Sequence, residues 1–399
     1  MEFRELSIKE FNEYLKKSNL KTFLQSPKMD NENVTSYYVG VEDNKKIIAA
    51  TRLTSLKRKF GYNYFYCPRG PLLDYHNEEL LTFFVDNLKK FVKKKKGYVL
   101  HIDPNIIHKS RDANGDITNE IDNSDIVESL KRQGFIHNGF TTGYDTTHQV
   151  RWTYVIDLEN KTYEDIEKDF KPHHISKIKK AEKYGITIKE LKYEDLPTFK
   201  EITEQTSKAI GFQDKDLAYY QRMYKSFGKE TKFVIAYLDV ENYKEKINKE
   251  LETYVKKYDK FYNKENSSAK EVKKNIDSLN NRLSEVDKYK EKMIPISASM
   301  FMMFGDEIIY LFSGNVDKYN NFYSQYLIQK MMIKYAVDNK YKKYNFSGIK
   351  GEFSKEKIVD GVYEFKKGFG GHVEELIGDF DLPINFLYRL NKIINRNRN

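Results

Sequence analysis

One carboxylate and one guanidinium in the first third of the chain stand where they could act on a substrate. Asp103 ends a short buried strand, expected over residues 97–103, and directly precedes Pro104. If desolvation raises its pKa, Asp103 can accept a proton, although capping the strand before Pro104 fits its position equally well. Arg69 can bind a carboxylate or a phosphate, but a structural salt bridge is the more common fate of such a residue. These groups suit the positioning of substrates and the transfer of protons.

A pair of lysines near the end of the chain is the second candidate. Lys366 and Lys367 fall in a strand expected over residues 362–367, between Phe365 and Phe369. A charged lysine is rarely buried without a partner, so we expect at least one of the two to reach a polar cleft. There an ammonium group can neutralise a phosphate or donate a hydrogen bond to a developing oxyanion. The alternative is an ordinary pair of lysines on a strand.

The sequence offers few means of nucleophilic or metal-assisted catalysis. Among its eight histidines and its one cysteine, Cys67, only the adjacent His173 and His174 lie close enough in sequence to suggest a metal site. We interpret these two as surface residues of a lysine-rich helix. The sequence contains neither a Walker-type phosphate loop nor a serine nucleophile elbow. We therefore expect no metal and no cofactor, as in a transferase that only aligns two reactive substrates.

Composition and charge bound the class of protein. The chain has 399 residues and a formal net charge of +10, which attracts phosphate-rich partners such as nucleic acid, nucleotide-linked substrates or an anionic membrane face, although lysine is simply common here. One cysteine cannot form a disulfide within the chain, which fits a reducing cytosol. The polar start over residues 1–11 lacks the apolar core of a signal peptide, and no apolar run is long enough to span a bilayer. We expect a cytoplasmic protein whose membrane contact, if any, is peripheral and at the inner face.

Alternating strands and helices must position these residues. We expect a first unit over residues 1–150, of the α/β or α+β class. Its strands are expected at 34–41, 46–53, 62–67 and 97–103, and its helix at 77–93. The second unit is expected over residues 151–399. Its strands are expected at 152–158, 232–238, 297–304, 307–312, 344–347, 362–367 and 373–377, and its helices at 163–184 and 320–339.

Residues 240–293 break this alternation. Apolar residues recur at intervals of three and four from Val240 to Phe261 and again from Ala269 to Val286, with charged residues on either side. Such heptad patterns predict two packed helices, and the short polar stretch between them requires an antiparallel hairpin. We expect a coiled-coil hairpin inserted in the second unit. Its mixed charges favour a solvated coiled coil over a surface that binds tRNA.

Six segments, in order along nearly the whole chain, resemble the Fem family of aminoacyltransferases. They are residues 64–71, 100–104, 178–185, 345–351, 361–369 and 377–385. The hairpin also lies where that family carries a coiled-coil arm. The resemblance implies an α+β fold of two acetyltransferase-like (GNAT-like) domains, with an antiparallel coiled-coil arm inserted in the second.

The resemblance also implies a reaction. A small amino acid, Gly, Ala or Ser, would pass from aminoacyl-tRNA to the stem-peptide lysine of a peptidoglycan precursor, or to a residue already attached there. The precursor would be lipid II or a soluble UDP-linked muropeptide, and the resemblance favours the lipid II type without deciding between them. Because the donor ester is already activated, the attacking amine needs only deprotonation and alignment. Aminoacyl-tRNA would be a co-substrate, and no cofactor is implied.

Some site residues follow from the same resemblance. Phe365, Lys366 and Lys367 match the family segment whose lysine is linked to tRNA handling and catalysis. The ammonium group of that lysine would serve either phosphate or the oxyanion. Lys28 lies near the place where some members carry a phosphate-binding lysine, although the spacing differs.

Three further residues match positions around the family's substrate. Lys215 and Tyr219 fall where the family holds substrate phosphate with a basic residue and a tyrosine. A lysine lacks the bidentate fork of the usual arginine, and a solvated helix face is the alternative. Tyr310 matches a tyrosine that lines the substrate cleft, and its alternative is a strand aromatic in the core.

Two other classes of function compete with the transferase. One is a non-catalytic basic protein that uses its coiled coil to bind RNA or a partner. The other is an acetyltransferase that uses acetyl-CoA. The sequence lacks the glycine-rich turn that binds pyrophosphate before a helix, which counts against the acetyltransferase.

Overall fold

A computed structural model describes residues 1–58, 61–144, 149–211, 213–260, 267–353 and 360–390. The chain forms two compact units. Unit 1 comprises Met1–Asp157, Met303–Ile309 and Lys342–Asn399, and unit 2 comprises Leu158–Met302 and Tyr310–Tyr341. These bounds differ from the predicted division into 1–150 and 151–399, because strands from the last third of the chain pair with strands from the first third.

The first sheet of unit 1 contains the predicted N-terminal strands. In spatial order it runs β1 (Glu2–Glu5), β2 (Thr35–Asp43), β3 (Lys46–Lys57), β4 (Asn63–Cys67), β5 (Gly97–Ile102), β16 (Phe380–Pro383) and β8 (Ile136–His137). The turn between β2 and β3 places Asn44 and Lys45 at φ 47° and 62°, the left-handed geometry of a tight hairpin. Its helices are α1 (Ile8–Lys17), α2 (Glu78–Lys94) and α3 (Ser124–Arg132), and short 3₁₀ helices cover Phe23–Gln25 and Pro27–Met29.

A second group of strands in unit 1 packs against the helix that carries the C-terminal lysines. Its order is β14 (Lys343–Gly348), β9 (Trp152–Asp157), β15 (His372–Leu376), β6 (Ile107–Arg111) and β7 (Ile117–Asp122). The segment predicted as a strand at 362–367 is instead the helix α11 (Gly361–Lys367), so that prediction is wrong. The side chain of Asp360 caps this helix by accepting a hydrogen bond from the Val362 N–H, and Phe365 packs on Phe369 one turn later.

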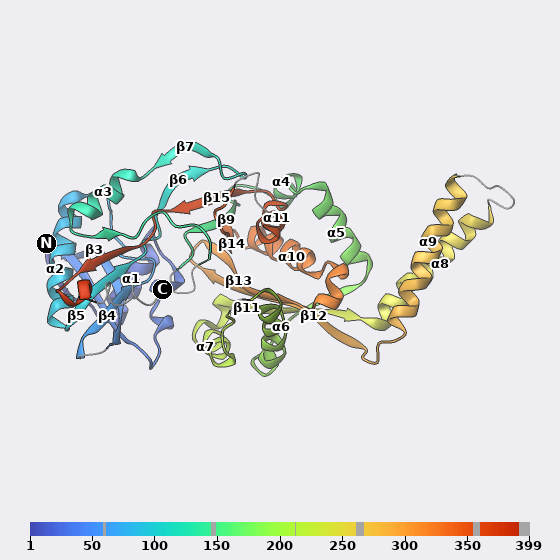
Figure 1. Cartoon of the computed structure of the whole chain (residues 1–399), viewed down its shortest axis with the longest axis horizontal. Helices are drawn as coiled ribbons and strands as arrows, with labels where there is room; N and C mark the ends of the chain where they lie inside the picture. The colour runs from blue at the N-terminus through green and yellow to red at the C-terminus, as the bar shows by residue number, and fades with distance from the viewer. Residues whose placement is uncertain (59–60, 145–148, 212, 261–266, 354–359, 391–399) are drawn as a thin grey trace. The chain divides into compact units, whose positions relative to one another are not determined.

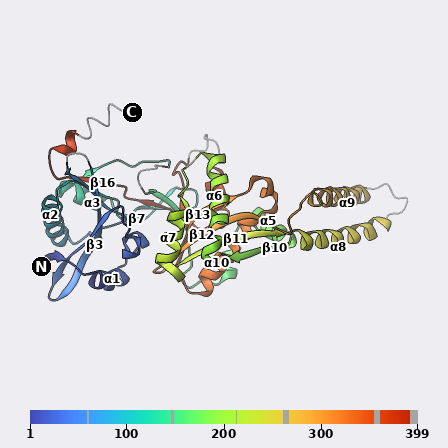
Figure 2. The same ribbon diagram turned by 90° about the horizontal axis from the view of Figure 1, so that it is seen from below.

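Unit 2 packs helices on both faces of an antiparallel group of strands (Figures 1 and 2). The strands are β10 (Ile186–Glu190), β11 (Thr231–Asp239), β12 (Met293–Phe304) and β13 (Glu307–Asn315), except that the end of β12 and the start of β13 belong to unit 1. The helices are α4 (Tyr163–Lys168), α5 (Pro172–Lys183), α6 (Leu196–Ile210), α7 (Leu217–Phe227) and α10 (Ser324–Asp338), with 3₁₀ helices at Tyr193–Asp195, Gly228–Glu230 and Asp317–Phe322. The single helix predicted over 163–184 is broken into α4 and α5, because a proline restricts the residue before it and cannot continue a helix.

The hairpin predicted over 240–293 forms two helices, α8 (Val240–Asp259) and α9 (Ser267–Val286), which pack against each other (Figure 1). The predicted end of the first heptad series, Phe261, lies outside the described residues. At the base of the hairpin, the ring of Tyr243 lies 5.5 Å from that of Tyr184 and 5.2 Å from that of Phe322. The base therefore belongs to the core of unit 2, and supercoiling of the two helices stays a prediction.

Candidate active site

Asp103 lies in unit 1, where the parallel strands β4 and β5 end side by side. Its carboxylate is 3% exposed and accepts two hydrogen bonds, from the Arg69 N–H at 2.6 Å and from the Tyr66 hydroxyl at 2.7 Å. Burial raises the pKa of Asp103 above its usual value, although both donors and the charge of Arg69 oppose this shift. A carboxylate with a raised pKa is suited to accept a proton near neutral pH.

Arg69 connects Asp103 to a second part of unit 1. The residue has a φ of 54°, which is rare for a residue with a side chain, and it is largely buried. Its guanidinium group donates a hydrogen bond to the carbonyl oxygen of Val150 at 2.5 Å. The described contact of the guanidinium group is with the backbone, and the binding of a carboxylate or phosphate by Arg69 stays a prediction. A strained conformation held by buried contacts is typical of functional sites.

Lys366 is the buried member of the lysine pair. Its side chain extends from α11, and its ammonium group donates to the carbonyl oxygen of Gly348 at 2.5 Å. The hydroxyl of Tyr144 is directed at the same oxygen, at 3.4 Å. Burial lowers the pKa of Lys366 to about 7, although the negative charge of Asp360 opposes this shift. Near neutral pH its amine can therefore accept a proton or, once protonated, donate a hydrogen bond.

Gly348 brings the surroundings of Arg69 and of Lys366 together. A Cβ atom at this position would lie 2.7 Å from Cγ1 of Val150, whose carbonyl oxygen binds Arg69, so only glycine fits. The carbonyl oxygen of Gly348 in turn binds Lys366. Asp103, Arg69 and Lys366 are thus joined by one series of contacts within unit 1, although they are far apart in the sequence.

Lys367 and Phe365 lie on other sides of α11, because successive side chains of a helix point about 100° apart. The ammonium group of Lys367 donates to Oδ1 of Asn114 at 2.7 Å and lies 5.3 Å from the ring centre of Tyr363. The Phe365 ring packs on Phe369 at 5.4 Å. These contacts resemble those of an ordinary structural lysine and aromatic residue. Burial therefore favours Lys366 over Lys367 as the candidate, and its role stays a prediction.

A half-buried acid near this site, Glu307, was missed by the sequence analysis. Nδ2 of Asn345 donates to Oε1 of Glu307 at 2.7 Å, and the backbone N–H of Ser347 donates to Oδ1 of the same asparagine at 2.7 Å. Burial raises the pKa of Glu307, although the charge of Lys343 opposes the shift. Glu307 and Asn345 thereby fix the end of β14, just before Gly348. A glutamate at the start of a strand gives no sequence signal that it is half-buried.

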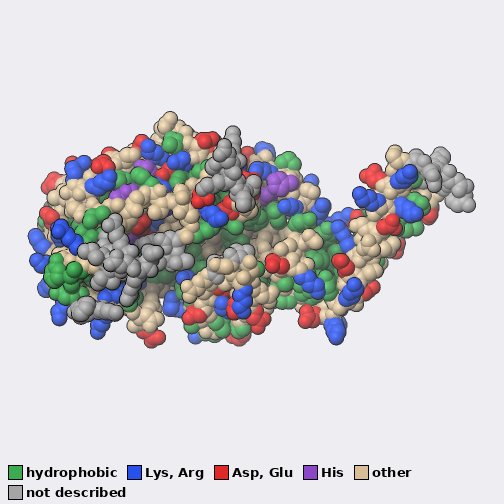
Figure 3. All heavy atoms as spheres, viewed as in Figure 1, with side chains coloured by type: hydrophobic (Ala, Val, Ile, Leu, Met, Phe, Trp, Pro, Cys, Tyr) green, Lys and Arg blue, Asp and Glu red, His purple; other side chains and the backbone are tan. Residues whose placement is uncertain are grey.

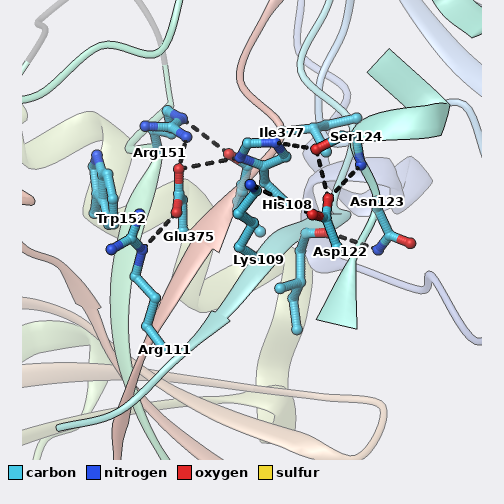
Figure 4. A network of polar contacts seen from close by, with 12 residues as sticks. His108, Lys109, Arg111, Asp122, Asn123, Ser124, Arg151, Trp152, Glu375 and Ile377 are labelled. Carbon is cyan, nitrogen blue, oxygen red and sulfur yellow. Dashed lines mark hydrogen bonds and ion pairs between the residues drawn. The ribbon is translucent and has the colours of Figure 1, made fainter. Parts of the chain in front are cut away.

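Figure 4 shows a second buried network, centred on Glu375 of β15. Its carboxylate binds Nε of Arg111 at 2.5 Å, the guanidinium group of Arg151, and Nδ1 of His108 at 3.2 Å. Nε2 of His108 lies 3.2 Å from the hydroxyl oxygen of Ser124. Burial alone would raise the pKa of Glu375, but the bonds from His108 and Arg111 and the charge of Arg151 lower it to about 2. This network holds β6, β9, β15 and the start of α3 together.

In unit 2, two cations lie within 6 Å of the ring centre of Tyr219. Its half-buried ring packs on Phe312 at 5.8 Å, and burial raises the pKa of Tyr219 to about 12. Nζ of the exposed Lys215 lies 5.7 Å from the ring centre, and Cζ of Arg222 lies 5.2 Å from it. Arg222 was missed by the sequence analysis, although its place three residues after Tyr219 on α7 puts it on the same helix face. It can supply the bidentate fork that Lys215 lacks.

Tyr310 and Lys28 belong to different units. Tyr310, in unit 2, is buried, stacks on Phe301 at 5.5 Å and donates its hydroxyl to Oε1 of Gln325 at 3.2 Å. These contacts suit the core alternative. Lys28, in unit 1, is exposed on a 3₁₀ helix that Ser26 caps. The binding roles implied for both residues stay predictions.

Two further expectations concern nucleophiles and metal ligands. Within the described ranges, no three His, Cys, Asp or Glu side chains are grouped so as to hold a metal ion. His174 was expected at the surface, but it is buried against Tyr326, with ring centres 4.8 Å apart, because it faces inward from α5. Burial raises the pKa of Cys67 to about 12, so its thiol is a poor nucleophile.

No helix in the described part of the chain is long and apolar enough to cross a membrane.

Comparison with known proteins identifies relatives of this chain by sequence and by structure. The sequence profile of the FemAB family matches residues 6–396. The aminoacyltransferase FemA of Staphylococcus epidermidis is 32% identical over 402 residues, which cover 96% of each chain. The crystal structure of FemX matches with a TM-score of 0.77 at 24% identity, covering 98% of this chain and 99% of that one. A tandem GNAT protein from the clavulanic acid biosynthesis pathway matches with a TM-score of 0.51 at 8% identity, covering 96% and 98%. These two likenesses confirm the predicted α+β, GNAT-like fold class.

Proposed function

The chain belongs to the FemAB family, and we propose that it is an aminoacyltransferase that moves a small amino acid from aminoacyl-tRNA to the peptide of a peptidoglycan precursor. The observation that carries this proposal is the 32% identity to an aminoacyltransferase FemA over 96% of both chains. The reaction would take place on the cytoplasmic side of the membrane, where aminoacyl-tRNA is available, with no cofactor.

The contacts of unit 1 support a mechanism of alignment and proton transfer. The acceptor amine attacks the ester carbonyl of the aminoacyl-tRNA, forming a C–N bond and a tetrahedral oxyanion. Asp103, whose buried carboxylate has a raised pKa, accepts the proton of the amine. The C–O bond to the tRNA ribose then breaks, and the ribose oxygen leaves with that proton. The products are an amide and a deacylated tRNA, so atoms and charges balance.

Lys366 has the second role in this mechanism. In its protonated form the buried ammonium group can donate a hydrogen bond to the oxyanion or neutralise a tRNA phosphate. A donor that is held in place before the reaction stabilises the transition state without reorganisation. The contact of Lys366 with Gly348 supplies this fixed position.

In unit 2, we infer that the cations beside Tyr219 bind the phosphates of the precursor. Lys215 and Arg222 both lie within 6 Å of the same ring, so two positive charges can meet one phosphate group. Lipid II and a UDP-linked muropeptide both carry a diphosphate, and this arrangement does not distinguish them. We favour the lipid-linked precursor, as the resemblance to the family implies.

The test is a transfer assay with defined components. The protein is incubated with glycyl-, alanyl- or seryl-tRNA and with either precursor, and the mass of the product is measured. We expect one residue to be added to one precursor, without ATP or added metal once the tRNA is charged. Full activity with the free amino acid and ATP, but without tRNA, would overturn the proposal.

A further inference from the structure

The outer side of α5 and the adjoining base of α8 carry four lysines in unit 2. Lys179, Lys180 and Lys183 are exposed on the last turns of α5, and Lys246 of α8 is half-buried beside the end of that helix. We call these four residues the α5 basic face. Figure 3 shows blue lysine and arginine side chains gathered over this part of unit 2. A row of such groups attracts polyanions.

The acidic residues nearby leave this face positive. Oε1 of Glu182, the only acidic residue of α5, is bound by Lys330 of α10 at 2.6 Å. Glu250 of α8 pairs with Lys183. Lys246 donates to the backbone carbonyl oxygen of Glu182 at 3.4 Å. Because this acceptor is uncharged, the contact does not neutralise the ammonium group of Lys246. Within the described parts of the chain, Lys179 and Lys180 form no ion pair.

The shape of the face suits a phosphate backbone better than a lipid surface. Pro172, Ile175 and Ser176 line a shallow hollow of about 330 Å³, together with Lys179, Lys180 and Lys183. The other apolar side chains of α5, Ile178 and Ala181, are buried on its inward side. A helix that binds membranes inserts large apolar side chains beside its lysines, whereas α5 presents beside them only Pro172 and the half-buried Ile175. Over the five residues from Lys179 to Lys183, the lysines span about 6 Å of the helix axis.

We propose that the α5 basic face binds the phosphate backbone of the aminoacyl-tRNA. This inference rests on the proposed function, because it assumes that tRNA is a substrate. Double-stranded RNA is recognised largely through its shape and its phosphates, which requires fixed cations and no base-specific groups. The α5 basic face provides such cations and includes none of the residues placed in the transfer chemistry, so it contributes affinity and not catalysis.

The test compares two double variants for tRNA binding. K179A/K180A removes the two lysines without ion pairs, and K89A/K90A removes a matched adjacent pair that is exposed on α2 of unit 1. Binding of fluorescent tRNA to the full chain is measured by polarisation between 50 and 200 mM salt. Each phosphate contact contributes about 0.9 to the slope of log affinity against log salt. Loss of two contacts should therefore reduce the slope by about 1.8. The ratio of the tRNA affinity of the wild type to that of K179A/K180A should then fall about twelve-fold between 50 and 200 mM salt.

The results of these measurements separate the possibilities. The inference is supported if only K179A/K180A loses affinity and slope, while its turnover at saturating tRNA equals that of the wild type. Equal losses in both double variants, or none in K179A/K180A, would overturn it. Unchanged tRNA binding with lost binding to phosphatidylglycerol vesicles would assign the face to a membrane instead. If the wild type neither binds tRNA nor transfers an amino acid, the proposed function itself fails.

Discussion

Lys366 and Lys367 are neighbours in α11 with different surroundings. The first is 5% exposed and its ammonium group donates to the backbone oxygen of Gly348, whereas the second donates to the side chain of Asn114. The turn of the helix between them separates one buried cation from one at the surface. Substitution of each in turn therefore tests a buried and an exposed ammonium group in the same sequence context.

The first prediction concerns turnover. Lys366→Met keeps most of the packing of the side chain and removes its charge, whereas Lys367→Met removes a charge at the surface. We expect turnover with saturating precursor to fall by about two to three orders of magnitude in K366M, as for the loss of an oxyanion donor, and to stay near wild type in K367M. Near-wild-type turnover in both variants would remove Lys366 from the mechanism.

The second prediction concerns stability against pH. The pKa of Lys366 is about 7 in the folded chain against an ordinary 10.5. The charged form is therefore less favourable in the folded than in the unfolded chain, which costs part of the free energy of unfolding. This cost is full below pH 7 and disappears as the pH rises toward 10.5. We expect the free energy of unfolding of the wild type to rise relative to K366M over this window, by at most about 1.4 kcal/mol per pH unit. Urea unfolding at pH 7 and at pH 9.5 measures it, and a constant difference would contradict the buried position.

The third prediction concerns Asp103. In Asp103→Asn, the amide oxygen can still accept from the Arg69 N–H, and the amide nitrogen can donate to the oxygen of Tyr66. The melting temperature should therefore change little. We expect turnover to fall by about two to four orders of magnitude, because the proton acceptor is lost. Normal turnover with normal melting would assign Asp103 to capping alone.

The fourth prediction concerns the network around Glu375. The pKa of this residue is lowered to about 2 from 4.5, so its ionised form stabilises the fold fully above pH 4.5 and less as the pH falls toward 2. Glu375→Gln leaves Arg151 and Arg111 without their carboxylate, and we expect a loss of about 3–5 kcal/mol at pH 7. The loss should shrink below pH 4.5. The control is E13Q, at an exposed position of α1, which should unfold like the wild type at each pH.

The fifth prediction concerns the helical hairpin. Replacing residues 251–276 by a short Gly/Ser link retains Tyr243 at the base, so the melting temperature should stay within a few degrees of wild type. Replacing residues 240–286 removes the contacts of Tyr243 with Tyr184 and Phe322, which should cost more than about 3 kcal/mol. Calorimetry of both variants measures this. Equal melting would show that the base contributes nothing to the core.

Local patterns in the sequence predicted much of this fold. The strands β2 to β5, helix α2 and the pair α8 and α9 each have a regular apolar period, and their neighbours in the sequence are also their neighbours in space. The position of Asp103 at the end of a buried strand was also predicted, because a strand end before proline is visible in the sequence. These elements depend on contacts of short range, which local periodicity reports.

The features that the sequence did not reveal depend on contacts between residues that are far apart in the chain. The segment 362–367 contains residues that suit a strand, yet Asp360 caps it as a helix that packs on β9. The burial of His174 depends on Tyr326, and the partial burial of Glu307 depends on Asn345. The choice between Lys366 and Lys367 depended on the carbonyl oxygen of Gly348. Such partners are unknown until the fold is known, because tertiary contacts override local preference.

The place of β16 in its sheet has a consequence for synthesis on the ribosome. This strand, Phe380–Pro383, lies between β5 and β8, which are made more than two hundred residues earlier. While the chain is being translated, β5 therefore has an open edge, which can pair with other chains. Unit 2 is complete once Tyr341 has emerged, whereas unit 1, although begun first, waits for its C-terminal strands. A premature stop in the last twenty residues before β16 would leave the N-terminal sheet unfinished.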